Sequence, residues 1–225
     1  MTTGHFSYLL DSSILLCYDT HMPIKTVLFD LGNVLSHDGH ETYLTDEMYG
    51  LALGLGEPKE IVTQKVNHIF RKYAVLSEAS ESEFWKEIAD TLGIVLSSEA
   101  VEAVKQQITS TNPEAIESFE LLKEHGINIG IISNSSPFFY EAQATPLRLN
   151  EYANPNLMFL SHKLGRLKSD GLFELTAETV EPASTYIIDD RPKNVEYAQR
   201  LGFQAVAYSF ESGDSLLSLV QKITS

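Results

Sequence analysis

Basic residues are scarce in this sequence, and they are not gathered anywhere. The 225 residues include 16 Lys and Arg against 31 Asp and Glu, which gives a formal net charge of −15. A nucleic acid would be repelled by this charge unless a strong basic patch compensated for it, and the sequence has no Lys or Arg block. We therefore expect no nucleic-acid partner. A small anionic ligand would need a focused positive site, such as one lysine or a metal ion.

Cysteine and long apolar runs are also lacking. Cys17 is the only cysteine, so no intramolecular disulfide can form, and a reducing, cytoplasmic setting is expected. No apolar run approaches the roughly 20 residues of a membrane span, so no membrane association is expected. Residues 1–22 lack a basic n-region, and Asp11 interrupts their apolar part, which makes a poor signal peptide. We expect them to form a peripheral extension, with Met22 as an alternative start.

The apolar content, 43% of the chain, is ordinary for a folded protein. Five short apolar segments are predicted to be strands: 24–29, 127–132, 157–160, 184–188 and 203–208. Three of them show no clean alternation, as expected of strands covered on both faces. Amphipathic helices over 113–126 and 192–202 lie between them, each with Pro near its start and Gly at its end. This alternation predicts an α/β fold with a doubly wound, mainly parallel Rossmann-like sheet.

The interval 40–111 breaks the alternation of strands and helices. Residues 59–75 carry apolar side chains at helical spacing, and so do residues 97–108. Within 80–93, Ser80 and Glu83 have the spacing of a capping box that begins another helix. An all-helical insert between the first and second strands is therefore predicted.

Polar residues directly follow four of the predicted strands. They are Asp30 after the first, Ser133 and Asn134 after the second, Lys168 after the third, and Asp189 and Asp190 after the fourth. Ligands of open parallel sheets bind beyond the carboxyl ends of the strands, so these side chains are expected to converge. Taken singly, each has an ordinary structural explanation: a strand-end turn, a helix N-cap, a solvated lysine or a capped turn.

Together, these residue types suit phosphoryl transfer. Clustered carboxylates repel one another unless a cation lies among them, and hard oxygen ligands suit Mg²⁺. A carboxylate such as Asp30 can attack phosphorus to form an aspartyl-phosphate. Ser133 and Lys168 would then hold phosphoryl oxygens, and backbone N–H groups after Asp30 would add to that cradle.

The order of these motifs resembles the haloacid dehalogenase (HAD) superfamily over roughly residues 24–210. The first motif, FDLGNV, resembles a subgroup with helical caps that includes the bacterial glucose-1-phosphatase type and the phosphatase domains of epoxide hydrolases. The resemblance implies a core of residues 23–39 and 112–225 with a helical cap of residues 40–111. It also implies a Mg²⁺-dependent phosphatase that acts on a small phosphate ester.

The resemblance also implies roles for single residues. Asp30 would be the nucleophile, and Mg²⁺ would be bound by Asp30, the backbone carbonyl of Gly32, Asp189 and Asp190. Ser133 and Asn134 would bind phosphate. Lys168 would orient both the nucleophile and the phosphate, and Asn194 would support the acidic loop.

Gly32 departs from the pattern, because most phosphatases of the superfamily carry an aspartate there that protonates the leaving group. Losing such a group typically costs about 10²–10⁴-fold in rate. Three explanations stay open: His37 or Asp38 takes over proton transfer, the natural leaving group needs little protonation, or the enzyme is weak or inactive. Glycine is usual in FDLGNV-type members, which favours retained activity.

Three other functions compete with the phosphatase. A metal-independent 2-haloacid dehalogenase would use the same aspartate but generally lacks the paired acids seen at Asp189 and Asp190. A binding or regulatory protein on this scaffold is supported only by Gly32. A receiver-type phosphoacceptor carries its paired acids after the first strand and has no cap. The substrate and the oligomeric state are not determined by the sequence.

Overall fold

Five parallel strands form the centre of the computed structural model, which describes residues 23–37 and 43–225. They are β1 (Thr26–Phe29), β2 (Asn128–Ser133), β3 (Met158–Leu160), β4 (Thr185–Asp189) and β5 (Gln204–Ala207). Their order in the sheet is β3-β2-β1-β4-β5, and every pairing is parallel. This confirms the predicted doubly wound α/β sheet. Residues 1–22 and Asp38 lie outside the described residues.

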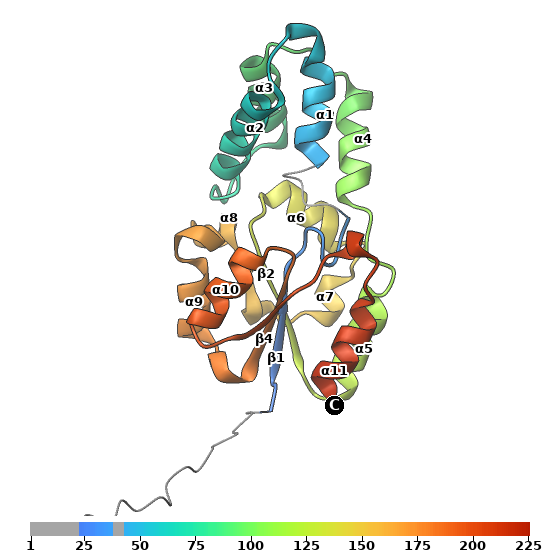
Figure 1. Ribbon diagram of the computed structural model, residues 1–225, viewed down its shortest axis with the longest axis vertical. Helices are drawn as coiled ribbons and strands as arrows, with labels where there is room; N and C mark the ends of the chain where they lie inside the picture. Colours follow the sequence, from blue (N-terminus) through green and yellow to red (C-terminus); the bar gives the residue numbers. More distant parts are fainter. Residues whose placement is uncertain (1–22, 38–42) are drawn as a thin grey trace, which may run out of the picture.

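Alternate side chains of β1 belong to separate apolar clusters on opposite faces of the sheet. Each face is covered by its own helices (Figure 1). On one face, Val27 and Phe29 pack with α5 (Ala115–Glu124), α7 (Leu149–Tyr152) and α11 (Leu216–Thr224). On the other face, Leu28 packs with α9 (Phe173–Thr179) and α10 (Pro192–Arg200). Because both faces are covered, the strand carries an unbroken apolar run, which is why the sequence showed no alternation.

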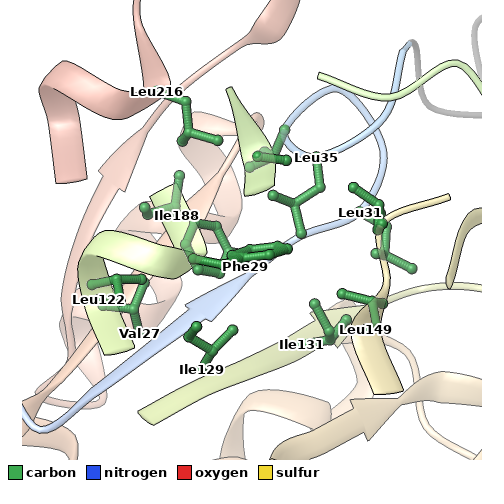
Figure 2. Packing of buried hydrophobic residues seen from close by; sticks show 14 of the residues in the cluster. Val27, Phe29, Leu31, Leu35, Leu122, Ile129, Ile131, Leu149, Ile188 and Leu216 are labelled. Carbon is green, nitrogen blue, oxygen red and sulfur yellow. The ribbon is translucent and has the colours of Figure 1, made fainter. Parts of the chain in front are cut away.

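Figure 2 shows the first of these layers, where Phe29 lies at the centre of the cluster. The rings of Phe29 and Phe119 meet edge to face, with their centroids 5.5 Å apart. In β2, a side chain at Gly130 would meet Leu157 and Leu28, since a Cβ atom there would lie 2.5 Å from the Leu157 carbonyl oxygen. Glycine therefore lets the chain after α7 approach the sheet closely.

Four helices follow β1 and lie beyond the carboxyl ends of the strands (Figure 1). They are α1 (Tyr43–Ala52), α2 (Lys59–Tyr73), α3 (Glu81–Leu92) and α4 (Ser98–Ile108), and we call them the cap helices. Their apolar faces form a separate cluster around Val66, Phe84 and Ile88. The Ser80 hydroxyl accepts a hydrogen bond from the Glu83 N–H, which confirms the predicted N-cap of α3. The exact boundaries of the cap, 40 and 111, stay a prediction.

Helix α6 (Pro137–Ala144) connects the sheet to the cap helices. Phe139 of α6 inserts into the cap cluster, with its ring centroid 5.5 Å from that of Phe84. The buried amide of Gln143 donates to Ser36 Oγ (2.7 Å) and to the Ile108 carbonyl oxygen (3.2 Å). The chain segments that enter and leave the cap are thus held together beneath it. One further helix, α8 (Ser161–Leu164), follows β3.

No helix in residues 23–37 and 43–225 has both the length and the apolar composition that crossing a membrane requires.

Candidate active site

Asp30 directly follows β1, at the carboxyl end of the strand. Its N–H still donates to the Ile188 carbonyl oxygen of β4 (2.9 Å), which holds the backbone in register. One carboxylate oxygen, Oδ1, accepts a hydrogen bond from the Leu31 N–H at 2.7 Å, and the Ser133 hydroxyl also contacts the carboxylate. The side chain is largely buried, with 12% of its surface exposed. Asp30 is therefore held by neighbours on both sides.

Lys168 joins the acids of two strands. Its Nζ atom lies 2.6 Å from Asp30 Oδ2 and 2.7 Å from Asp189 Oδ2, and only 2% of its side chain is exposed. Burial alone would lower the pKa of the Lys168 ammonium, but the negative charges of Asp189 and Asp30 outweigh it and raise that pKa. The lysine is therefore charged, and it is paired on both sides. Its own backbone N–H donates to Asn134 Oδ1 (2.8 Å).

Asp189 is fully buried at the end of β4, and both its oxygens accept hydrogen bonds. Lys168 bonds to Oδ2, while Oδ1 accepts from the Arg191 N–H (2.9 Å) and from the side-chain amide of Asn194 (2.8 Å). Helix α10 begins at Pro192, which places Asn194 in its first turn. The chain turns sharply between strand and helix, and the Asp189 carboxylate stabilises that turn.

Asp190, the next residue, is more accessible, with 19% of its side chain exposed. Burial, followed by the charges of Asp30 and Asp189, raises the pKa of the Asp190 carboxyl to about 7. The pKa of Asp30 is also raised, first by burial and further by Asp189, although Lys168 opposes the change. The site therefore carries more negative charge than Lys168 alone can balance.

The three carboxylates form a set of oxygen donors that fits a divalent cation. One oxygen from each of Asp30, Asp189 and Asp190 lies within 4.8 Å of the other two. The donors are all hard oxygens, which suits Mg²⁺. A cation among them would offset the repulsion that raises the pKa of Asp190. The residues present therefore fit the metal that the sequence predicted. Gly32 is buried in the loop two residues after Asp30.

The structure brings most of the predicted site residues together. Asp30, Ser133, Lys168, Asp189 and Asp190 all lie at the carboxyl edge of the sheet.

Two other predicted site residues, Asn194 and Asn134, form hydrogen bonds to residues of this group. The side-chain amide of Asn194 donates to the Asp189 carboxylate, and its role in supporting the acidic loop stays a prediction. Asn134 lies in the same loop as Ser133, but its amide oxygen holds the backbone of Lys168. Phosphate binding by Asn134 stays a prediction.

His37 lies against the ring of Phe210 and pairs with Glu211 at 3.3 Å, so its imidazole is engaged with the chain that follows β5.

Sequence reasoning gave no role to Asn33, which shapes the loop after Asp30. Its φ of 57° is in the left-handed region, which Asn adopts more readily than most residues. Its carbonyl oxygen accepts from the Phe210 N–H (2.7 Å), and its side-chain oxygen accepts from the Glu211 N–H (3.3 Å). Asn33 thereby ties the Asp30 loop to the chain after β5. The signal was present in the sequence, since Asn tolerates the left-handed conformation and is common in turns.

The sequence matches a family model described as haloacid dehalogenase-like hydrolase over residues 24–202. Comparison with curated proteins by sequence gave no match.

Solved structures with a similar fold include several whose descriptions name HAD family enzymes. A HAD family enzyme from Bacteroides thetaiotaomicron has a TM-score of 0.70 and 19% identity, covering 87% of this chain and 98% of that one. The same enzyme in complex with magnesium and inorganic phosphate has a TM-score of 0.66 and 20% identity, with the same coverage. The L-2-haloacid dehalogenase from Xanthobacter autotrophicus, with chloropropionic acid covalently bound, has a TM-score of 0.52 and 18% identity, covering 82% and 77%.

Proposed function

The chain belongs to the haloacid dehalogenase-like hydrolases, and on that basis we propose that it is a Mg²⁺-dependent phosphatase acting on a small phosphomonoester. The observation that carries this proposal is the approach of three carboxylates, Asp30, Asp189 and Asp190, around one buried lysine. A site for metal-independent chemistry has no need of so many clustered acids. The related Bacteroides enzyme with magnesium and inorganic phosphate supports the choice of both ligands.

Mg²⁺ would be held by Asp30, Asp190 and the backbone carbonyl of Gly32, with Asp189 behind them. Once bound, the cation would neutralise phosphate charge that the acids would otherwise repel. Both oxygens of Asp189 are engaged by neighbours, so this residue holds Lys168 and the acidic turn in position. Asn194 maintains that arrangement through its bond to Asp189.

In the first step, a carboxylate oxygen of Asp30 forms a bond to phosphorus as the bond to the ester oxygen breaks. The leaving alkoxide takes a proton from a water molecule, because Gly32 offers no side chain for the transfer, and an aspartyl-phosphate remains on the chain. Water then attacks phosphorus, which releases inorganic phosphate and restores the carboxylate. Lys168 and Ser133 would hold the phosphoryl oxygens as their charge develops, and the Leu31 N–H would orient the Asp30 carboxylate.

The cap helices lie over this edge of the sheet, where they would exclude water and contact the alcohol part of the ester. Gly32 supplies no side chain for proton transfer, so the proposal favours esters whose leaving group needs little help. A small-molecule substrate, no nucleic-acid partner and a cytoplasmic location are parts of the same proposal.

The test is hydrolysis of a panel of phosphate esters, with p-nitrophenyl phosphate as the reference, with and without Mg²⁺. Wild type should be active only with Mg²⁺, and Asp30→Asn should be inactive. Asp90→Asn is a matched control, because Asp90 is an exposed acid of α3 paired with Lys86 and should leave the rate unchanged. Turnover by Asp30→Asn equal to that of wild type would overturn the assignment of Asp30 as the nucleophile. Release of halide from 2-haloacids in EDTA would instead indicate a dehalogenase.

A further inference from the structure

Arg71 is exceptional among the basic residues of the cap helices. Residues 43–111 contain five lysines and one arginine among a larger number of acids. Every one of these lysines pairs with a carboxylate: Lys59 with Asp46, Lys65 with Glu57, Lys72 with Glu87, Lys86 with Asp90 and Lys105 with Glu81. Arg71 has no carboxylate partner in the described part of the chain, and its side chain is exposed. An acidic surface thus leaves one guanidinium without a counter-ion.

The hydrogen-bond partner of Arg71 lies outside the cap helices, in the chain that follows β3. Its Nη2 atom donates to the hydroxyl of Ser169 at 3.1 Å, and the two residues are 98 positions apart in the chain. Ser169 directly follows Lys168, whose Nζ atom contacts Asp30. Arg71 is therefore placed beside the turn that carries the lysine of the candidate active site.

A second contact fixes the same end of α2 over the site. The carbonyl oxygen of Ala74, just after the helix, accepts a hydrogen bond from the Ser161 hydroxyl at 2.6 Å. Ser161 follows β3, and its hydroxyl also accepts from the N–H of Ser135 in the loop after β2. In Figure 1, the lower end of α2 points toward α8 at the strand ends. The last turn of α2 thus contacts the chain after β3 directly, and it is linked to the loop after β2 through Ser161.

We propose that Arg71 is a specificity-determining residue that binds a second anionic group in the alcohol part of the phosphate ester. This inference rests on the proposed phosphatase function. A guanidinium pairs with a carboxylate or a phosphate through two parallel hydrogen bonds, and one bond to Ser169 leaves it further N–H donors. Without Arg71, the second negative charge would face a protein of net charge −15.

The experiment compares kcat/KM for two matched pairs of esters. Phosphoglycolate and ethyl phosphate differ by a carboxylate, and a hexose bisphosphate differs from its monophosphate by a second phosphate. Wild type should prefer the anionic member of at least one pair, which identifies the group that Arg71 binds. Arg71→Gln should reduce that preference about 10- to 100-fold, as expected for loss of a charge-assisted hydrogen bond. Arg71→Lys should restore part of it.

Two control variants separate substrate binding from docking of the cap. Ser169→Ala removes the hydrogen-bond partner but keeps the guanidinium, so it should retain the preference. Lys72→Gln changes the neighbouring cation, which is paired with Glu87, and should also retain it. The inference is overturned if Ser169→Ala and Arg71→Gln reduce the preference equally, or if wild type hydrolyses both members of each pair equally well. Failure of wild type to hydrolyse any ester would overturn the phosphatase proposal itself, and this inference with it.

Discussion

The Nζ atom of Lys168 lies 2.6 Å from a carboxylate oxygen of Asp30, although one residue follows β3 and the other follows β1. The same ammonium contacts Asp189 at 2.7 Å, so one buried cation links the loop after β3 to the ends of β1 and β4. Such a group is costly to bury unless it is fully paired. The pairing explains why Lys168 can be 98% covered and still charged.

Lys168→Met should abolish phosphatase activity and also destabilise the protein. The substitution leaves Asp30 and Asp189 buried without their counter-ion, and breaking a buried pair in this way costs about 3–5 kcal/mol. The free energy of unfolding should fall by this amount when it is measured by urea denaturation in EDTA at neutral pH. Lys163→Met, at an exposed lysine of α8, serves as the control. Unchanged stability of Lys168→Met would show that the lysine does not neutralise these acids.

Asn194→Asp should weaken Mg²⁺ binding. The side-chain amide of Asn194 donates to Asp189 Oδ1, and a carboxylate there would repel Asp189 and displace the acidic turn. Loss of such a supporting contact typically costs about 10–100-fold in metal affinity. Calorimetric titration of Mg²⁺ should show a weaker dissociation constant of this order. Lys193→Gln, one residue earlier and exposed, should bind Mg²⁺ as wild type does. Equal Mg²⁺ affinities of Asn194→Asp and wild type would show that Asn194 does not support the metal site.

The raised pKa of the Asp190 carboxyl predicts how the free energy of unfolding depends on pH in the absence of metal. Its pKa is raised to about 7 in the folded state, above the ordinary value of 3.8 that applies after unfolding. At pH values between these two pKa values, the folded state binds more protons than the unfolded state. The contribution of Asp190 to the free energy of unfolding is therefore fully present below the lower pKa and is lost as pH rises through 7. Asp190→Asn should therefore be more stable than wild type at pH 8, by about 1–4 kcal/mol.

The same relation predicts the effect of the metal. Mg²⁺ should stabilise wild type more at pH 8 than at pH 5, because protons compete for Asp190 at the lower pH. Thermal unfolding at the two pH values, with and without Mg²⁺, measures this difference. A metal effect independent of pH would contradict the assignment of Asp190 to the cation site.

Gly32→Asp should increase the rate with alkyl phosphates. By family resemblance, position 32 is where other phosphatases carry the residue that protonates the leaving group. Gly32 is not among the glycines with positive φ in the described residues, so its backbone conformation is one that an aspartate can adopt. Such a group supplies about 10²–10⁴-fold in general, and a gain of about tenfold in kcat is expected here. The gain with p-nitrophenyl phosphate should be smaller, because its leaving group needs little protonation. No gain with either ester would show that another group already transfers the proton.

The sheet and most of the site could be predicted from the sequence because both have local signals. Strands buried on both faces are short, dense apolar runs, and polar residues after such runs mark the ligand edge. Asp30 and the pair after β4 were found in this way. Their convergence follows from the topology, since parallel strands place their carboxyl ends together.

Most of the remaining features depend on tertiary contacts or lie in segments too short to show a pattern. Helices α7 and α8 have four residues each, too few to show a helical period. The bond between Asn134 and the Lys168 backbone spans 34 residues, and that between Arg71 and Ser169 spans 98. Helix α11 was not predicted, although Ser215 caps it and its apolar residues have helical spacing, so its signal could have been found.

The central claim, that Asp30 forms a covalent bond to phosphorus, is tested most directly by mass spectrometry of the protein after rapid acid quenching during turnover with Mg²⁺. The account predicts a transient mass increase of one phosphoryl group in wild type, located by digestion to the peptide that contains Asp30, and no such increase in Asp30→Asn. Turnover with no phosphorylated protein at any time, or a phosphoryl group found on a different peptide, would contradict it.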